Sequence, residues 1–335
     1  LLAVSPLAYD PLQSYATALP WCRFILLYAA LRHWVLVRPK PLMIVGYSVM
    51  GLLALTAIDT LWQYMFDVSL SGHAINNSGR LSGPMDNVKV GLFITKLLFP
   101  ALAVVIFFAR DKSFGVRAAW GAAAFLSMVA VLLSGERTPF FSMMLGLLCA
   151  VTILMIYEPR RRLAYVKGII MAALCIAVLF ATQPWLQRRA WELYITLAQF
   201  PTTPYGQLFW VGYELGKEFW LSGTGFKGFR ELCTNFLASG AVNHCNLHPH
   251  NPYIEWFAEA GIIGLLLFIA LVGAFFHAGL QAVRRHGGVV AALAIGTCVM
   301  HFFPLMATQS YFSNWPAIIL WYSLGLMFSA SSVCI

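Results

Sequence analysis

Charged residues are scarce in this chain. Its 335 residues include 22 Lys and Arg and 13 Asp and Glu, so only 10% are charged, whereas 60% are hydrophobic. A soluble domain carries about 25% charged residues, and a water-soluble fold of this length could not bury so many apolar side chains. The composition therefore excludes an ordinary soluble domain and predicts an all-α, polytopic integral membrane protein.

Several motifs are also absent. No glycine-rich phosphate loop leads into Lys and Ser or Thr, which argues against ATP-driven transport. No Asp-x-Asp pair could hold Mg²⁺ for a nucleotide-sugar enzyme. Acidic residues are nearly absent from the apolar segments, which disfavours an ion-coupled transporter, and the basic–aromatic runs that bind nucleic acid are missing. His244, His248 and His250 might suggest zinc, but no further ligand of suitable spacing lies on a firm scaffold, so we expect no metal. Together with the missing motifs, this leads us to expect no cofactor and no nucleotide.

Long apolar segments are what the chain does have. A membrane-spanning helix needs about 20 mostly apolar residues. Residues 1–20 are apolar but broken by three prolines, and we interpret them as the remnant of a further span, with residues expected before Leu1. We therefore predict a bundle of about nine to twelve spans in all. The nine predicted spans lie near residues 21–37, 42–65, 90–109, 118–134, 139–157, 165–183, 256–277, 288–306 and 314–332.

The basic residues indicate an orientation. Eleven Lys and Arg lie in one set of connecting loops and three in the alternate short loops, and cytoplasmic loops are the ones enriched in such residues. The sequence thus predicts a multi-pass protein of the bacterial inner membrane, with the long loop 184–255 in the periplasm. Its three parts would be a bundle over 1–183, this loop, and helices over 256–335. The three outer basic residues are Arg80, Lys89 and Arg137.

The long loop is itself expected to be partly folded. Residues 185–199 and 205–220 space their large apolar side chains as helices do, which predicts two amphipathic helices on the membrane lipids, the second ended by Gly223-Thr224-Gly225. Cys233 and Cys245 could form a disulfide if the loop faces an oxidising compartment. The alternative is two unpaired thiols.

A polar cluster closes this loop, in the pattern His250-Asn251-x9-Gly261-x-x-Gly264. His250 could be a general base or a donor to phosphate. Asn251 could hold the imidazole or cap the next helix, and Glu255 could orient the ring or simply favour a helix start. The two glycines would let a neighbouring helix approach closely. The structural alternative is a capping pair followed by a packing face.

Arginines are the second candidate group. Arg137 lies between two predicted spans with almost no loop, where a buried charge is costly unless it is paired or hydrated. Its rigid fork of donors suits phosphate, although it could also pair with Glu136 or extend to lipid headgroups. Arg80 lies in a tight turn and is either a ligand or a solvated charge. Arg188, Arg189 and Arg230 belong to the long loop, where headgroup contacts are the simpler explanation.

The order of these motifs resembles the O-antigen ligase and Wzy-type polymerase superfamily, over roughly residues 40–300. The chain has fewer spans than the twelve or so that are usual in that superfamily. The resemblance rests on a long loop before the last spans and on the segments Gly79-Arg80-Leu81-Ser82-Gly83-Pro84, Ser134-Gly135-Glu136-Arg137, Gly223-Thr224-Gly225-Phe226-Lys227-Gly228-Phe229-Arg230, and His248-Pro249-His250-Asn251 with its glycines.

The resemblance implies an activity. Such ligases transfer a glycan from undecaprenyl pyrophosphate to a sugar hydroxyl of the lipid A-core oligosaccharide at the periplasmic face, without metal or ATP. Arg137 and a loop arginine would stabilise charge on the pyrophosphate, and His250 would take the acceptor proton or hold the phosphate. Which loop arginine serves is open between Arg188, Arg189 and Arg230. Further substrate-binding candidates are Arg80, Asn251 and Tyr205.

Other functions stay open at this point. No carboxylate is well placed as a covalent nucleophile, which favours inversion of the anomeric centre. A polymerase would join repeat units on the same lipid carrier, and sequence alone does not separate it from a ligase. A lipid-linked-glycan transporter is the alternative of another class, and it predicts charged residues deep in the spans. A purely structural protein leaves the Arg and His residues of one face unexplained.

Overall fold

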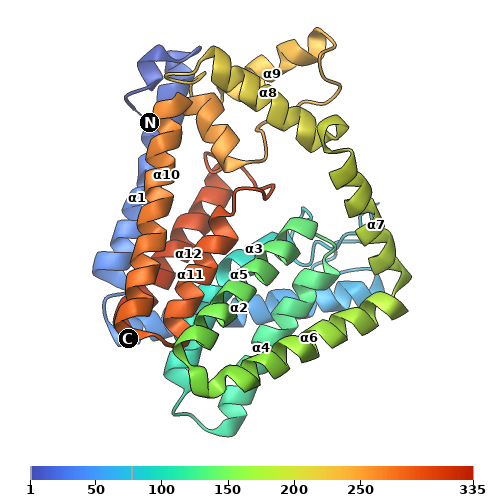
Figure 1. The fold of residues 1–335 in the computed structure, drawn as a ribbon, viewed down its shortest axis with the longest axis vertical. Helices are drawn as coiled ribbons and strands as arrows, with labels where there is room; N and C mark the ends of the chain where they lie inside the picture. Colours follow the sequence, from blue (N-terminus) through green and yellow to red (C-terminus); the bar gives the residue numbers. More distant parts are fainter. Residues whose placement is uncertain (1, 77, 335) are drawn as a thin grey trace. The chain divides into compact units, whose positions relative to one another are not determined.

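The computed structural model describes residues 2–76 and 78–334, apart from the side chains of residues 185, 189 and 286. Within these residues the secondary structure is helical, with one isolated β-bridge and no β-strand. The helices of Figure 1 are α1 (Pro11–Ala30), α2 (Pro39–Phe66), α3 (Val90–Ala109), α4 (Phe114–Leu133), α5 (Arg137–Tyr157), α6 (Arg162–Thr182), α7 (Pro184–Ala198), α8 (Pro204–Glu218), α9 (Gly228–Ala238), α10 (Pro252–His286), α11 (Gly288–Phe302) and α12 (Asn314–Val333).

Seven of the described helices are long and apolar enough to cross a membrane, which confirms the all-α polytopic class. Nine spans were predicted. The segment 21–37 covers only the second half of α1 and a π-helical turn at Leu31–Val35, and α1 carries polar side chains in its first half. The segment 288–306 forms α11, which has 15 residues and is shorter than a span requires. The seven are α2, α3, α4, α5, Pro159–Thr182, Pro252–Arg285 and α12.

The chain forms two compact units. The first contains residues 1–21, 154–270 and 307–312, and the second contains 22–153, 271–306 and 313–335. In the second unit α3 and α12 are the most buried spans, because α2, α4 and α11 pack around α3. The three-part division expected from topology follows chain order and stays a prediction.

The long loop supplies a small core of its own in the first unit. The predicted amphipathic helices are confirmed as α7 and α8, each of which starts at a proline, and the Thr203 hydroxyl caps α8 by accepting the Gly206 N–H at 3.1 Å. α8 ends at Glu218, before the Gly223–Gly225 turn, and α9 was not predicted. Buried Leu208 and Leu215 of α8 pack with Phe229 of α9 in this core.

A disulfide closes this core. Cys233 of α9 is bonded to Cys245, with their Cα atoms 6.0 Å apart. Of the two alternatives left by the sequence, a disulfide or two unpaired thiols, the structure contains the disulfide. The bond ties α9 to the segment that leads to His250.

A break in α10 explains the glycine motif. Gly261 has φ 64° and ψ −166°, so the carbonyls before it lose their partners within the helix. The residues after α8 take those positions: Thr224 N–H donates to Ala258 O at 2.8 Å and Gly225 N–H to Glu259 O at 3.0 Å. A Cβ on Gly261 would lie 2.4 Å from the Leu221 carbonyl oxygen.

The expected close approach of a neighbouring helix to these glycines is therefore wrong. A loop packs on Gly261 because the helix is open there, and the nearest atoms around Gly264 belong to α10 itself, in Trp256 and Ala260.

Replacing Gly261 with alanine should destabilise the protein. Its backbone conformation is one that only glycine adopts readily, and the new methyl would collide with backbone, so we expect a loss of about 2–5 kcal/mol in the free energy of unfolding. Denaturant unfolding in detergent measures this. Gly273→Ala is the matched control, because a Cβ there meets nothing within 4 Å. Equal stability of the two variants would contradict this account of the break.

Candidate functional site

The turn between α4 and α5 contacts two other segments of the second unit, one of which carries Arg80. Arg137 begins α5 directly after this turn. The backbone N–H of Leu81 donates to Ser134 O at 3.2 Å, which brings Arg80 beside the turn. The Glu136 carboxylate accepts the Gly91 N–H at 2.6 Å and interacts electrostatically with the positive charge of Arg80. The structure thus assembles two predicted site arginines, Arg80 and Arg137, around one turn.

Glu136 has an unusual proton affinity. Burial raises the pKa of its carboxyl to about 7, and the Gly91 N–H and the positive charge of Arg80 offset part of that effect. This partly buried carboxyl, with its raised pKa, lies next to Arg137 in the chain and close to Arg80.

Glu136 should also make stability depend on pH. Below pH 4.5 the carboxyl is protonated in the folded and the unfolded chain, while between pH 4.5 and about 7 the folded chain alone keeps the proton. Its stabilising contribution is therefore lost as the pH rises to about 7. We expect the melting temperature of Glu136→Gln, relative to wild type, to increase over this range. The exposed Glu218 provides the control Glu218→Gln, which should show no such trend. A flat difference for Glu136→Gln would refute the assignment.

His250 is held tightly in the first unit. Its φ is 59°, and its carbonyl accepts the Thr308 N–H at 2.6 Å. Ring Nδ1 lies 3.3 Å from Thr308 O, a pure acceptor, so Nδ1 carries the proton in the neutral ring. Nε2 is then the basic nitrogen, and it accepts from the Asn246 amide at 3.1 Å. This is the tautomer that a general base at Nε2 requires.

Two aromatic rings surround this imidazole. Tyr205 meets it edge-on with ring centroids 5.3 Å apart, and His248 lies 4.1 Å away by the same measure. The fold therefore places Tyr205, from the start of α8, beside His250. Asn246 and Thr308, which contact the ring directly, were not identified from the sequence, because neither belongs to a recognisable motif.

Asn251 is a helix cap. Its side-chain oxygen accepts the N–H groups of Tyr253 and Ile254 at 3.0 and 3.2 Å, and its carbonyl accepts that of Glu255 at 2.8 Å. The capping interpretation offered by the sequence is the one that the geometry matches.

Of the two roles that the sequence left open for Glu255, the structure matches the one at the start of a helix, in the first turn of α10. The buried carboxylate of Glu255 accepts the Tyr311 N–H at 3.2 Å, because α10 turns this side chain toward the segment 307–312.

The three competing loop arginines differ in their surroundings. Arg188 is exposed on α7. Arg230 is half-buried on α9, and its charge acts on the buried carboxylates of Glu255 and Glu259. The side chain of Arg189 lies outside the described residues. Within the described part of the chain, no group of three or more His, Cys, Asp or Glu could hold a metal ion.

A buried polar group inside the spans was missed. The His301 ring nitrogen Nε2 lies 2.9 Å from the Ser323 hydroxyl, which donates to Lys96 O at 2.6 Å. Lys96 and His301 are both almost fully buried in the second unit. A signal was present, since ionisable residues within apolar segments mark sites of interest in membrane proteins. Lys96 is therefore an ionisable residue buried within the candidate span α3.

Comparison with known proteins agrees with the predicted resemblance. Residues 122–269 match the family model Wzy_C, described as O-antigen ligase. This segment is less than half of the chain, and its match is consistent with the O-antigen ligase and Wzy superfamily. It contains Arg137, Arg230 and His250, whereas Arg80 precedes it.

The fold of the chain is similar to that of a solved structure. No curated protein matches the chain. A solved structure titled "Structural coordination of polymerization and crosslinking by a peptidoglycan synthase complex" contains a chain with a TM-score of 0.50 and 14% sequence identity, and the match covers 98% of this chain and 95% of that one. At this identity the similarity shows the fold alone.

Proposed function

We propose that the protein is an O-antigen ligase-type glycosyltransferase. It would transfer a glycan from undecaprenyl pyrophosphate to a sugar hydroxyl of the lipid A-core oligosaccharide. The observation that carries the proposal is the turn between α4 and α5, which we call the arginine turn. There the Leu81–Ser134 hydrogen bond brings Arg80 close to Arg137, and Arg137 lies in the segment that matches the family model. Two guanidinium groups are suited to a pyrophosphate that gains charge as its bond to the sugar breaks.

The roles of the residues follow from the chemistry. His250 Nε2 takes the proton of the acceptor hydroxyl, the hydroxyl oxygen forms a bond to the anomeric carbon, and undecaprenyl pyrophosphate leaves with the bonding electron pair. One displacement inverts the anomeric centre. Arg137 and Arg80 neutralise the leaving group, and Tyr205 packs beside the imidazole.

The long loop is proposed to face the periplasm of a bacterial cell. The bias of eleven against three basic loop residues supports this orientation. The Cys233–Cys245 disulfide supports it independently, because disulfides persist in oxidising compartments. After reduction, an impermeant thiol reagent should label these cysteines from the periplasmic side of intact cells. Labelling only from the cytoplasmic side would reverse the orientation.

A polymerase acting on the same lipid carrier is the second candidate. The analogy that supports it is a chain of similar fold in a solved structure whose title names polymerization by a peptidoglycan synthase complex.

One reaction separates the candidates. The purified protein is incubated with undecaprenyl-pyrophosphate glycan and lipid A-core, with chelator and without nucleotide. Glycan on the core supports the ligase, and longer chains on the carrier support the polymerase. If neither product forms, the enzymatic proposal fails and the transport alternative gains. Arg137→Ala, run in parallel, shows whether any product depends on the arginine turn.

A further inference from the structure

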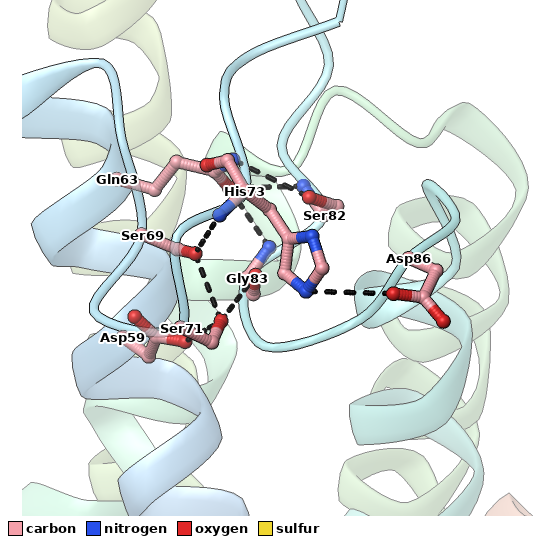
Figure 2. Close-up of polar contacts among 8 residues, drawn as sticks. All are labelled: Asp59, Gln63, Ser69, Ser71, His73, Ser82, Gly83 and Asp86. Atoms are coloured by element: carbon pink, nitrogen blue, oxygen red, sulfur yellow. Dashed lines mark hydrogen bonds and ion pairs between the residues drawn. The ribbon is translucent and has the colours of Figure 1, made fainter.

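Two polar residues of α2 organise the segment that carries Arg80. Asp59 and Gln63 are four residues apart, so both side chains leave the same face of the helix. Figure 2 shows them directed at the loop that follows α2, between its residues 69–73 and 82–83. Both side chains are buried, and Gln63 is 0% exposed.

Gln63 bonds both arms of this loop at once. Its amide oxygen accepts the backbone N–H groups of Ser82 and Gly83 at 2.9 and 2.8 Å. Its amide nitrogen donates to His73 O at 2.9 Å and to the Ser82 hydroxyl at 3.3 Å. A glutamine side chain has two N–H donors and one oxygen with two lone pairs, so these four bonds use its full capacity.

Asp59 supports the same arrangement one helical turn earlier. Its carboxylate accepts the Leu70 N–H at 2.5 Å and the Ser71 hydroxyl at 3.2 Å. The Ser71 hydroxyl also lies 3.4 Å from Gly83 O, and Gly83 has φ 55°. The first arm of the loop is thereby fixed to α2 and linked to the second.

Arg80 lies two residues before Ser82, the first of the two residues that Gln63 clamps. Its own N–H donates to the Asn76 side chain at 2.8 Å, and the next residue, Leu81, donates to Ser134 O. The backbone at Arg80 is thus held on one side by the turn that leads to Arg137 and on the other by Gln63. Loss of the glutamine amide would leave two buried N–H groups without an acceptor and release that side.

We infer that Gln63 is a positioning residue for Arg80: it clamps the Ser82-Gly83 backbone so that the Arg80 guanidinium is presented at the Arg137 turn. The inference rests on the proposed function only in assigning Arg80 to the donor pyrophosphate. Gln63 itself contacts no substrate. Its effect on transfer is exerted through Arg80.

Hydrogen exchange of the whole protein tests the clamp without any assay of activity. In Gln63→Leu, the backbone amides of residues 81–83 should exchange at least about tenfold faster than in wild type, because two buried hydrogen bonds are lost. Gln63→Glu keeps an acceptor but no donor, and should fall between the two. Ser127→Ala is the matched control, since it removes a buried hydroxyl of α4 that bonds only within its helix, to Ala123 O. Unchanged exchange in Gln63→Leu overturns the inference.

Kinetics then tests the link to Arg80. With undecaprenyl-pyrophosphate glycan as donor, Gln63→Leu should raise the donor KM about tenfold and leave the acceptor KM unchanged. The double variant Gln63→Leu/Arg80→Ala should be no worse than Arg80→Ala alone. Multiplied losses in the double variant would show that Gln63 acts elsewhere and would overturn the inference. If wild type transfers no glycan, the proposed function fails, whereas the exchange experiment still decides whether Gln63 holds the loop.

Discussion

Replacement of Arg137 by alanine should lower kcat/KM for glycan transfer by about 10²–10³-fold. Arg137 begins α5 at the charged turn, and its guanidinium would face the pyrophosphate as negative charge develops there. Removal of one preorganised donor to a developing anion has an effect of this size in other enzymes. Arg137→Lys should recover only part of the loss, because an ammonium group does not reproduce the bidentate fork. Steady-state transfer from undecaprenyl-pyrophosphate glycan measures both.

Arg117→Ala controls for a general loss of positive charge. Arg117 lies exposed on α4 in the same unit, and its removal should leave transfer unchanged. If Arg137→Lys is as active as wild type, bidentate binding of phosphate is not the role of Arg137.

His250→Asn should lower kcat by about 10²–10⁴-fold, the range expected when a general base is lost. Asparagine is the appropriate replacement because it tolerates the left-handed backbone of this position and keeps a polar side chain near Thr308. A loss in this variant therefore reflects the missing imidazole and not a refolded loop.

His244→Asn is the control in the same loop, and full activity is expected. Circular dichroism and the melting temperature should match wild type in both variants. Normal transfer by folded His250→Asn would refute the base assignment. A raised donor KM with unchanged kcat would instead indicate that His250 holds the phosphate.

The sequence allowed much of the outline to be predicted. Apolar segments of about 20 residues predicted α2 to α6 and α12 because length and hydropathy are local properties. The spacing of large apolar residues predicted α7 and α8. The predicted spans 21–37 and 288–306 are not among the seven candidate spans, because α1 carries polar side chains and α11 is short. The helix α9, which packs on α8 and holds the disulfide-bonded Cys233, was not predicted.

The sequence predicted the charged and titratable residues of the candidate site, but not the residues that contact them. Arg80, Arg137 and His250 stood out as charged or titratable residues beside apolar segments. Their partners did not: Asn246 and Thr308 at the imidazole, Gly91 at Glu136, and Gln63 beneath the Arg80 loop are ordinary residues until a contact gives them a role.

By itself, the sequence determined that this is a helical membrane protein, and its motifs indicated the O-antigen ligase family. Both depend on composition and local order, which need no knowledge of contacts. The tertiary structure alone decided that Gly261 opens α10 to a loop, that Asn251 caps a helix, that Nε2 of His250 is the basic nitrogen, and that Arg80 lies beside Arg137. The Asn251 cap uses bonds to residues that follow it closely. The other three depend on hydrogen bonds between residues far apart in the chain, and no local pattern specifies which distant donor meets which acceptor.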